Sequence, residues 1–537
     1  MRASEHPGDF AMRDHLDSCV TIHRQSMPFN SSSWRAIQNP SGMQVLVLRL
    51  SIIFASLLTV MPVSGQERDD TRLILEQNVD RRAAEREREL LKDEVRPSVT
   101  GRPVLIIDGK AYTVERTANA LGQALYLSLQ RQQWDAAQSF LTEYLSLPDR
   151  DPLLVHYAQG SLARVRGDLD QAQADYRALL RLRPDFLPGR LELARVLFED
   201  AQERESEKMF SDVLSSINAS DPKTAGVRKT IEAYRKALKQ RQSWTGSFSF
   251  GPTWTDNVNR TSASRTCLVS DSSGFCYYER ALPEAIRASG VDFDASAQKR
   301  IPLLGHHGVY IRSLLYGKQY RDYGEYNETT LITQAGYSYR TARHQVALAP
   351  LFEFYQWGND MLYGAWGGHG EWSYMLTPRS LIKLEGDYKD LRYRQELYAR
   401  NFDGSNRSVY ATYFHEVGGG WTLFGGLDFV DSEAEEDTNA YLQKGGRLGA
   451  SLQLSAGFVG TLFASYRHRE YGAYSPLFEA RREDDEQNYT LILKAPRWQA
   501  AGFVPVLTLR HNKVKSNVDW LYSYDRNDIS LKLERTF

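Results

Sequence analysis

Cys267 and Cys276 are the residues whose type and spacing most directly predict a covalent bond. They lie nine positions apart in a polar stretch, and the third cysteine of the chain, Cys19, precedes the expected export signal. Cysteines of exported proteins meet an oxidising compartment, where neighbouring thiols pair. We therefore predict a Cys267–Cys276 disulfide, because two thiols alone make a poor metal site.

The other residues able to do chemistry do not form a reaction site. His306 and His307 have no carboxylate or further histidine close by in the sequence, so we predict polar turn residues. Two acidic runs are expected in outer loops, where they could bind calcium but are more simply explained as solvated. Fingerprints of serine hydrolases, zinc proteases and nucleotide-binding proteins are absent. We predict no catalytic, metal or cofactor site and no enzymatic activity. The acidic runs are Asp431, Glu433, Glu435, Glu436 and Asp437, and then Glu483, Asp484, Asp485 and Glu486.

The second half of the chain alternates apolar and polar side chains, which is the pattern of strands with two different faces. Leu531 and Leu533 flank Lys532 near the C-terminus, and the same alternation recurs over 382–389 and 447–455. One face of such a strand suits lipid and the other suits water.

About fourteen segments follow this pattern, and each could cross a tilted bilayer span, which takes roughly 9–11 residues. Tight joints alternate with longer or more acidic ones, as in outer-membrane barrels. An even number of strands can close without leaving a sheet edge in lipid. We predict a 14-stranded antiparallel transmembrane β-barrel over 243–537, with a large soluble all-β domain as the alternative. The expected strands lie near 243–258, 289–302, 307–321, 326–340, 344–357, 362–376, 380–393, 405–417, 421–434, 441–454, 459–471, 485–495, 503–516 and 522–537.

Residues 117–242 show a helical repeat. Paired apolar segments recur at about 34–36 residues, the period of tetratricopeptide (TPR) repeats. We predict an N-terminal α-helical TPR-like solenoid of about three repeats, with a last helix over 224–241, and an ordinary helical bundle as the alternative. Small residues are expected at helix contacts and large aromatic ones between helices. These are Ala136, Ala137, Ala158, Ala172, Ala174 and Ala194, and then Phe140, Tyr144, Tyr176 and Phe210.

The N-terminal residues divide into targeting and lead-in segments. Residues 43–65 hold a continuous apolar run that ends in small residues, which predicts a signal peptide, with a transmembrane anchor as the alternative. Residues 1–42 are polar and irregular, so we interpret them as an over-extended gene start. Residues 66–116 combine a charge-dense lead-in, expected as a solvated helix or flexible segment, with a β-hairpin around an Asp-Gly turn.

Three short phrases stand out in this order of segments. They are Ile107-Asp108-Gly109-Lys110-Ala111-Tyr112-Thr113-Val114, Leu121-Gly122-Gln123-Ala124-Leu125-Tyr126-Leu127, and Thr255-Asp256-Asn257-Val258-Asn259 at the end of the first strand. With the order itself, they resemble the surface lipoprotein assembly modulators, or Slam proteins, over nearly all of 66–537. The resemblance marks Asp256, Asn257 and Asn259 as a family-like strand 1 motif.

The resemblance implies an outer-membrane translocon. Such a protein delivers surface lipoproteins, or related secreted proteins for nutrient or iron acquisition, from the periplasm to the cell surface. The repeat domain would lie in the periplasm and receive the client. Further implied partners are outer-membrane lipid and the barrel-assembly machinery, for which the terminal aromatic Phe537 suits an assembly signal.

The residues also bear on alternatives and mechanism. A net charge of −1 gives no reason to expect nucleic acid as a partner, and we expect a monomer. An exopolysaccharide exporter with a periplasmic TPR domain and a diffusion porin remain alternatives. The expected lumen face mixes charges, for example Lys383, Glu385 and Asp387, which suits an unfolded polypeptide better than a uniformly charged polymer. Two routes stay open: either the client crosses the lumen unfolded, or the barrel wall opens sideways, which is easiest where its first and last strands meet.

Overall fold

The computed structural model describes the chain except residues 1–64, 92–104, 108–109, 113, 219–220 and 455–456. The predicted gene-start segment and almost all of the predicted signal peptide lie outside the described residues. No helix in the part of the chain that the structure describes is long and apolar enough to cross a membrane.

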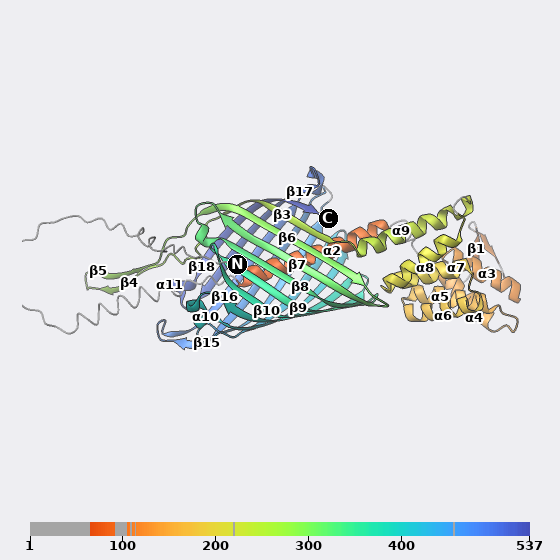
Figure 1. Cartoon of the computed structure of the whole chain (residues 1–537), viewed down its shortest axis with the longest axis horizontal. Helices are drawn as coiled ribbons and strands as arrows, with labels where there is room; N and C mark the ends of the chain where they lie inside the picture. The colour runs from red at the N-terminus through yellow and green to blue at the C-terminus, as the bar shows by residue number, and fades with distance from the viewer. Residues whose placement is uncertain (1–64, 92–104, 108–109, 113, 219–220, 455–456) are drawn as a thin grey trace, which may run out of the picture. The chain divides into compact units, whose positions relative to one another are not determined.

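Fourteen antiparallel strands close into one barrel in the second half of the chain (Figure 1). The 14-stranded barrel predicted from the sequence is confirmed, including the pairing of its first strand with its last. Successive strands are neighbours throughout, so every connection is a simple hairpin. The strands are β3 Thr245–Thr255, β6 Ala288–Pro302, β7 His307–Tyr320, β8 Glu328–Arg340, β9 His344–Trp357, β10 Asp360–Thr377, β11 Ser380–Tyr393, β12 Gly404–Gly418, β13 Trp421–Ser432, β14 Tyr441–Gln453, β15 Val459–Ser475, β16 Ala480–Lys494, β17 Phe503–Ser516 and β18 Tyr524–Thr536.

Side-chain alternation gives the barrel two chemically different surfaces. Leu384 is exposed on the outside, whereas its neighbours Lys383 and Glu385 are buried on the inside. The outer face carries further exposed apolar side chains, and the inner face carries buried charges. The outer set includes Leu348, Leu423, Leu448, Leu462 and Leu533, and the inner set includes Arg312, Glu371, Asp387, Arg447 and Arg467. The mixed-charge lumen expected from the sequence is therefore present.

Three helical pairs and a further helix form the repeat domain. Asp151 and Asp168 cap the starts of two helices, with side chains that accept backbone N–H bonds. The predicted aromatic residues are all buried, as are the predicted alanines except Ala174, which is exposed on α6. The repeats pack closely: a Cβ on Gly160 would lie 2.9 Å from the ring of Tyr176. The helices are α3 Ala118–Gln130, α4 Trp134–Leu145, α5 Pro152–Arg166, α6 Leu169–Leu182, α7 Leu187–Glu199, α8 Glu203–Ser216 and α9 Ala225–Arg241.

Smaller elements complete the described chain. The helix α2 (Gly65–Leu90) precedes the short hairpin of β1 (Leu105–Ile107) and β2 (Lys110–Tyr112). The long loop after β3 is itself a hairpin, formed by β4 (Arg265–Ser270) and β5 (Cys276–Ala281). Two short helices, α10 (Glu396–Phe402) and α11 (Asp519–Tyr522), lie in loops at the same end of the barrel strands as that hairpin.

Candidate translocation site

The helix α2 lies inside the barrel lumen, where buried polar contacts hold it. Asp70 accepts hydrogen bonds from Arg467 (2.6 Å), Asn488 (2.6 Å) and Ser465 (2.8 Å), which lie on β15 and β16. Arg467 also reaches Asp428 on β13 at 2.7 Å. Asp70 and Arg467 are both fully buried, so each charge depends on the other for compensation.

A second cluster lies two residues further along α2. Arg72 donates to Asp387 on β11 at 2.5 Å, and both side chains are almost completely buried. His369 Nδ1 lies 2.7 Å from the other oxygen of Asp387. The guanidinium of Arg72 also faces the ring of Tyr410. Arg72 is therefore held by two adjacent strands, β11 and β12, and His369 of β10 holds its partner Asp387.

Two further contacts extend this pattern along the helix. Glu76 lies 3.9 Å from Lys383 and 4.0 Å from Arg312. Arg68 donates to the hydroxyl of Tyr363 at 2.6 Å and stacks over Tyr355.

The sequence predicts that α2 is a helix or flexible segment in solvent, and that prediction of solvation is wrong. Charge density favours a polar environment, and the inside of this barrel supplies one.

The junction of β3 and β18 has the shortest ladder in the barrel. Seven residue pairs are in register there, against eleven to fourteen at each of the other junctions. The ladder is interrupted at Gly251 and Pro252 of β3, and proline lacks the N–H group that a ladder needs. We call this junction the seam. The seam therefore has the fewest residue pairs in register of all the junctions in the barrel.

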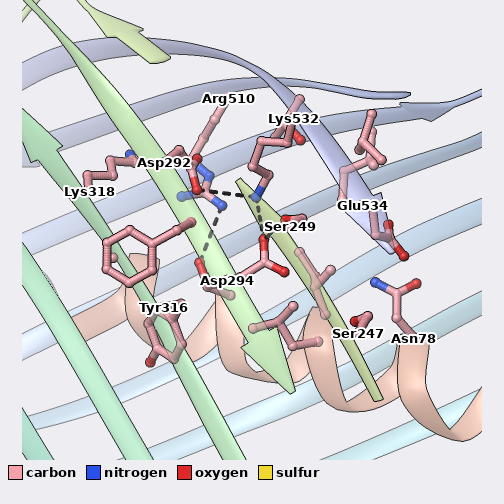
Figure 2. A pocket seen from close by; sticks show the side chains of 18 of the residues that line it. Asn78, Ser247, Ser249, Asp292, Asp294, Tyr316, Lys318, Arg510, Lys532 and Glu534 are labelled. Atoms are coloured by element: carbon pink, nitrogen blue, oxygen red, sulfur yellow. Dashed lines mark hydrogen bonds and ion pairs between the residues drawn. The ribbon is translucent and has the colours of Figure 1, made fainter. Parts of the chain in front are cut away.

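Side chains inside the lumen bridge the seam. Lys532 of β18 contacts both Asp292 and Asp294 of β6, so it reaches across β3 (Figure 2). Ser249 of β3 donates to Asp294. On the far side of the interruption, Lys318 of β7 lies 3.1 Å from Asp528 of β18. These ion pairs stabilise the closed seam where the backbone ladder is weak.

The repeat domain contacts the barrel through polar pairs at the tight turns. Asp200 lies 2.8 Å from His306, and Glu205 accepts a 2.7 Å bond from the backbone of Gly305. Glu203 pairs with Arg300 of β6 at 3.2 Å. From the sequence, His306 is predicted to be a turn residue without a carboxylate partner. The structure corrects this, because Asp200 supplies a carboxylate from a distant part of the chain.

Within the repeats, aromatic rings form a continuous row. Tyr157 on α5 lies 6.5 Å from Tyr126 on α3 and 6.0 Å from Phe186, which precedes α7. Burial raises the pKa of Tyr157, so its hydroxyl stays neutral. Next to this row, Arg164 bridges Glu192 and Glu199. Burial opposes the charge of Arg164, but the two carboxylates outweigh it and raise its pKa. The row therefore links α3, α5 and the start of α7, and charged side chains lie beside it.

Comparison with known proteins identifies the family. Residues 244–537 match the family described as Surface lipoprotein assembly modifier, and residues 108–210 match its N-terminal TPR repeats. The chain belongs to the surface lipoprotein assembly modifier family. The resemblance inferred from the sequence is confirmed, and so is the TPR character of the helical domain.

Named relatives in this family match most of the chain. The chain is 40% identical to a protein of Acinetobacter baumannii named hemophilin secretion modulator, over 87% of this chain and 96% of the relative. It is 28% identical to surface lipoprotein assembly modifier 1 of Haemophilus influenzae, over 75% and 82% of the two chains. It is 26% identical to surface lipoprotein assembly modifier 1 of Neisseria meningitidis, over 81% and 86%.

In this surface lipoprotein assembly modifier, the predicted disulfide is present. Cys267 and Cys276 are bonded, with Cα atoms 5.8 Å apart, and they join β4 to β5. The hairpin that they hold is exposed, and the rings of Phe275 and Tyr277 meet edge to face near its tip. The disulfide therefore stabilises a loop rather than forming part of the lumen.

The strand 1 motif residues tie the first strand to its surroundings. Asp256 accepts bonds from the backbone and side chain of Asn527 on β18. Asn257 donates to the carbonyls of Thr261 and Asp525, and Asn259 donates to that of Glu284. A functional role for this motif stays a prediction, but its position at one end of the seam is clear.

The remaining candidate residues lie apart. His307 contacts Tyr337 and does not share the contact of His306 with Asp200. The acidic run 483–486 lies within β16 and not in a loop, so its members alternate: Asp484 and Glu486 point inward, Glu483 and Asp485 outward. The described residues contain no group of three or more histidine, cysteine or acidic side chains placed to hold a metal.

Sequence reasoning missed the contacts between α2 and the lumen. The acidic and basic residues of α2 face inward-pointing charges of the wall over more than two turns. A signal for this existed, since the lumen charges expected on several strands needed compensation. The partner could not be identified, because pairs such as Asp70 and Arg467 lie almost 400 residues apart.

Proposed function

We propose that this chain is an outer-membrane translocon that carries a client protein from the periplasm to the cell surface, without catalytic chemistry. The client is a surface lipoprotein or a secreted heme-acquisition protein. In this chain a TPR domain is joined directly to a barrel, and the helix α2 of the same chain occupies the lumen of that barrel. This arrangement is the observation that carries the proposal. Family membership and the name of the Acinetobacter baumannii relative support it.

The repeat domain lies in the periplasm and receives the client. Helix α9 ends at Arg241 and β3 begins at Thr245, so the domain joins the barrel at the end with tight turns. Short turns of outer-membrane barrels face the periplasm. The ring row of Tyr126, Tyr157 and Phe186 gives the receiving surface its apolar component. A client held there is at high effective concentration beside the barrel.

The client leaves by the seam, and α2 keeps the lumen sealed meanwhile. A path through the lumen would first have to expel α2 and leave Asp70, Arg72 and their wall partners without compensation, which is costly for buried charges. Opening the seam breaks a ladder of seven residue pairs and bends no hairpin turn. The short seam therefore favours a sideways route.

Two alternatives fit the structure less well. A diffusion porin needs an open water-filled lumen, whereas buried ion pairs fix α2 inside this one. An exopolysaccharide exporter needs a track of one charge for its polymer. The lumen side of β11 instead places Lys383, Glu385 and Asp387 in succession, each paired.

A disulfide lock across the seam tests the function and the route together. Phe250 and Leu533 are in register across the seam, and both point outward. The double variant Phe250→Cys, Leu533→Cys is produced together with a candidate client, a surface lipoprotein or a heme-acquisition protein. Surface display of that client is measured on intact cells with antibody and protease. We expect oxidation to abolish display.

The matched control locks a different junction. Leu423 and Ala450 are in register between β13 and β14, so the variant Leu423→Cys, Ala450→Cys should keep display after oxidation. Display that survives the seam lock would refute the sideways route. Display that survives deletion of the whole gene would refute the translocon function itself.

A further inference from the structure

The barrel contains a cavity of about 700 Å³ at the end with tight turns. It is lined by the second half of α2, by the end of α9, and by the ends of β6 to β13 that lie beside the tight turns. The turn residues Arg343 and Arg379 also reach it. We call this cavity the basic vestibule. Sites of this size hold a ligand as large as a drug molecule, so the vestibule can take a short polypeptide segment but no folded domain.

Its lining is strongly basic. Eleven arginine and lysine residues line the vestibule, against four acidic residues. The basic residues are Arg81, Arg88, Arg241, Lys299, Arg300, Arg312, Arg340, Arg343, Arg379, Lys383 and Lys494, and the acidic ones are Asp80, Glu87, Glu371 and Glu416. Basic residues therefore outnumber acidic ones in this lining.

The four carboxylates are already engaged by cations. Glu371 pairs with Arg312 (3.1 Å) and Lys383 (3.3 Å). Glu87 pairs with Arg241 (2.6 Å). The two others make longer contacts: Glu416 lies 3.7 Å from Arg88, and Asp80 lies 4.0 Å from Arg312. No carboxylate of the lining is left over for the remaining arginines.

Three arginines stand without a carboxylate at ion-pair distance among the described residues: Arg340, Arg343 and Arg379. Arg340 ends β8, and the other two lie in the neighbouring tight turns 341–343 and 378–379. Like charges gathered in a concave site raise the local potential and attract anions.

We propose that the basic vestibule binds an acidic segment of the client polypeptide. This rests on the proposed function and adds the chemistry of the segment. The vestibule lies beside the end of α9, where the repeat domain joins the barrel, so a held client can reach it. Binding of an acidic segment would neutralise the three free arginines before the client moves to the seam.

An anionic lipid fits this place less well than a peptide. Its acyl chains would need apolar surface, which the barrel carries on its outer face, for example at Leu348 and Leu423. The vestibule lies inside the barrel, and its lining mixes apolar side chains such as Phe414 with polar ones such as Gln298 and Ser338. A lipid would have to leave that outer apolar face to reach it, whereas a polypeptide segment would not.

Binding of a synthetic peptide of about twenty glutamates to the full-length protein in detergent tests the proposal. We expect binding that weakens as salt rises, because the lining charges are partly exposed and are screened. The triple variant Arg340→Gln, Arg343→Gln, Arg379→Gln should bind the peptide at least about tenfold more weakly. None of these side chains has an ion-pair partner among the described residues, so the barrel should fold normally.

A matched control removes three arginines from the other end of the strands. Arg392 and Arg400 are exposed there and pair only with surface carboxylates, and Arg394 lies between them. The variant Arg392→Gln, Arg394→Gln, Arg400→Gln should bind the peptide like wild type. Equal binding by both triple variants, or by a glutamine peptide of the same length, would overturn the proposal. Binding of lipopolysaccharide micelles with no binding of the peptide would overturn it in favour of an anionic lipid.

Client display separates this inference from the proposed function. We expect the vestibule variant to lower surface display of the client, while the control variant keeps it. If the vestibule variant keeps full display and the seam lock still abolishes it, the translocon function stands and the acidic-segment inference fails. If neither the seam lock nor deletion of the gene changes display, the proposed function fails instead.

Discussion

Replacing Arg72 with methionine should release α2 from the lumen. Arg72 is almost completely buried and its main partner is Asp387, at 2.5 Å. Methionine keeps much of the side-chain length but removes the charge and the donors. Removing one partner of a buried ion pair typically costs about 3–5 kcal/mol, because the other charge stays buried without compensation.

The cost here should fall near the lower end of that range. Asp387 keeps its contact with His369 at 2.7 Å, so its charge is partly compensated. A loss of about 3 kcal/mol raises the undocked fraction of α2 by roughly a hundredfold, since each 1.4 kcal/mol is a factor of ten. Undocking opens a water-filled path through a fourteen-stranded barrel.

Conductance and permeability report this opening. We expect the variant Arg72→Met to show frequent ion-conducting openings in planar lipid bilayers, where the wild type stays closed. Cells that produce it should become sensitive to a large antibiotic such as vancomycin. The matched control is Arg88→Met on the same helix, whose side chain is 69% exposed and pairs weakly with Glu416. Exposed pairs of this kind contribute about 0–1 kcal/mol, so the control should stay closed. If a folded Arg72→Met protein conducts no more than Arg88→Met, α2 is not held by these charges.

Two further predictions concern assembly and the outer loop. Phe537→Ser should lower the amount of barrel in the outer membrane, measured by fractionation, because the terminal aromatic suits recognition by the assembly machinery. The loop variant Phe275→Ser should leave that amount unchanged, and unchanged levels in both variants would contradict the assembly signal. The double variant Cys267→Ser, Cys276→Ser should lose local protease resistance in the β4–β5 hairpin, since closing so short a loop contributes roughly 2–3 kcal/mol in the chain-entropy model; equal cleavage with and without the bond would contradict this.

The barrel was predictable from the sequence because its signals are local. Residues such as Lys383 and Leu384 alternate along one strand, and the tight turns mark where each strand ends. Pairing of the first and last strands then follows, since an open edge in lipid would leave backbone groups without partners. The helical repeats were equally predictable, because each repeat is formed by one continuous segment of the sequence. Ala174 shows the limit: a small residue in the right repeat still faces outward on α6.

The candidate site was less predictable because it joins residues distant in sequence. No residue near Asp70 in the sequence indicates that Arg467 is its partner, and no residue near His306 indicates that Asp200 is. Charge density alone gave the wrong environment for α2, since the rule that charged helices lie in solvent assumes that interiors are apolar. The interior of this barrel is polar, and its buried charges needed partners that only the folded chain could identify.

The helix α2 and the seam differ in how strongly buried charges hold each of them in place. The contacts of Asp70 and Arg72 with the lumen wall are buried and numerous, so removing α2 from the lumen is expensive. The seam, in contrast, combines a short backbone ladder with a few side-chain bridges such as Lys532 to Asp292. A client that binds at the basic vestibule sits at the same end of the barrel as the start of β3 and the end of β18. Opening that end of the seam first would break only the pairs between Gly251 and the terminus, four of the seven in register. In the proposed route α2 stays in the lumen throughout, so that a protein would cross by the seam while small solutes would not pass through the barrel.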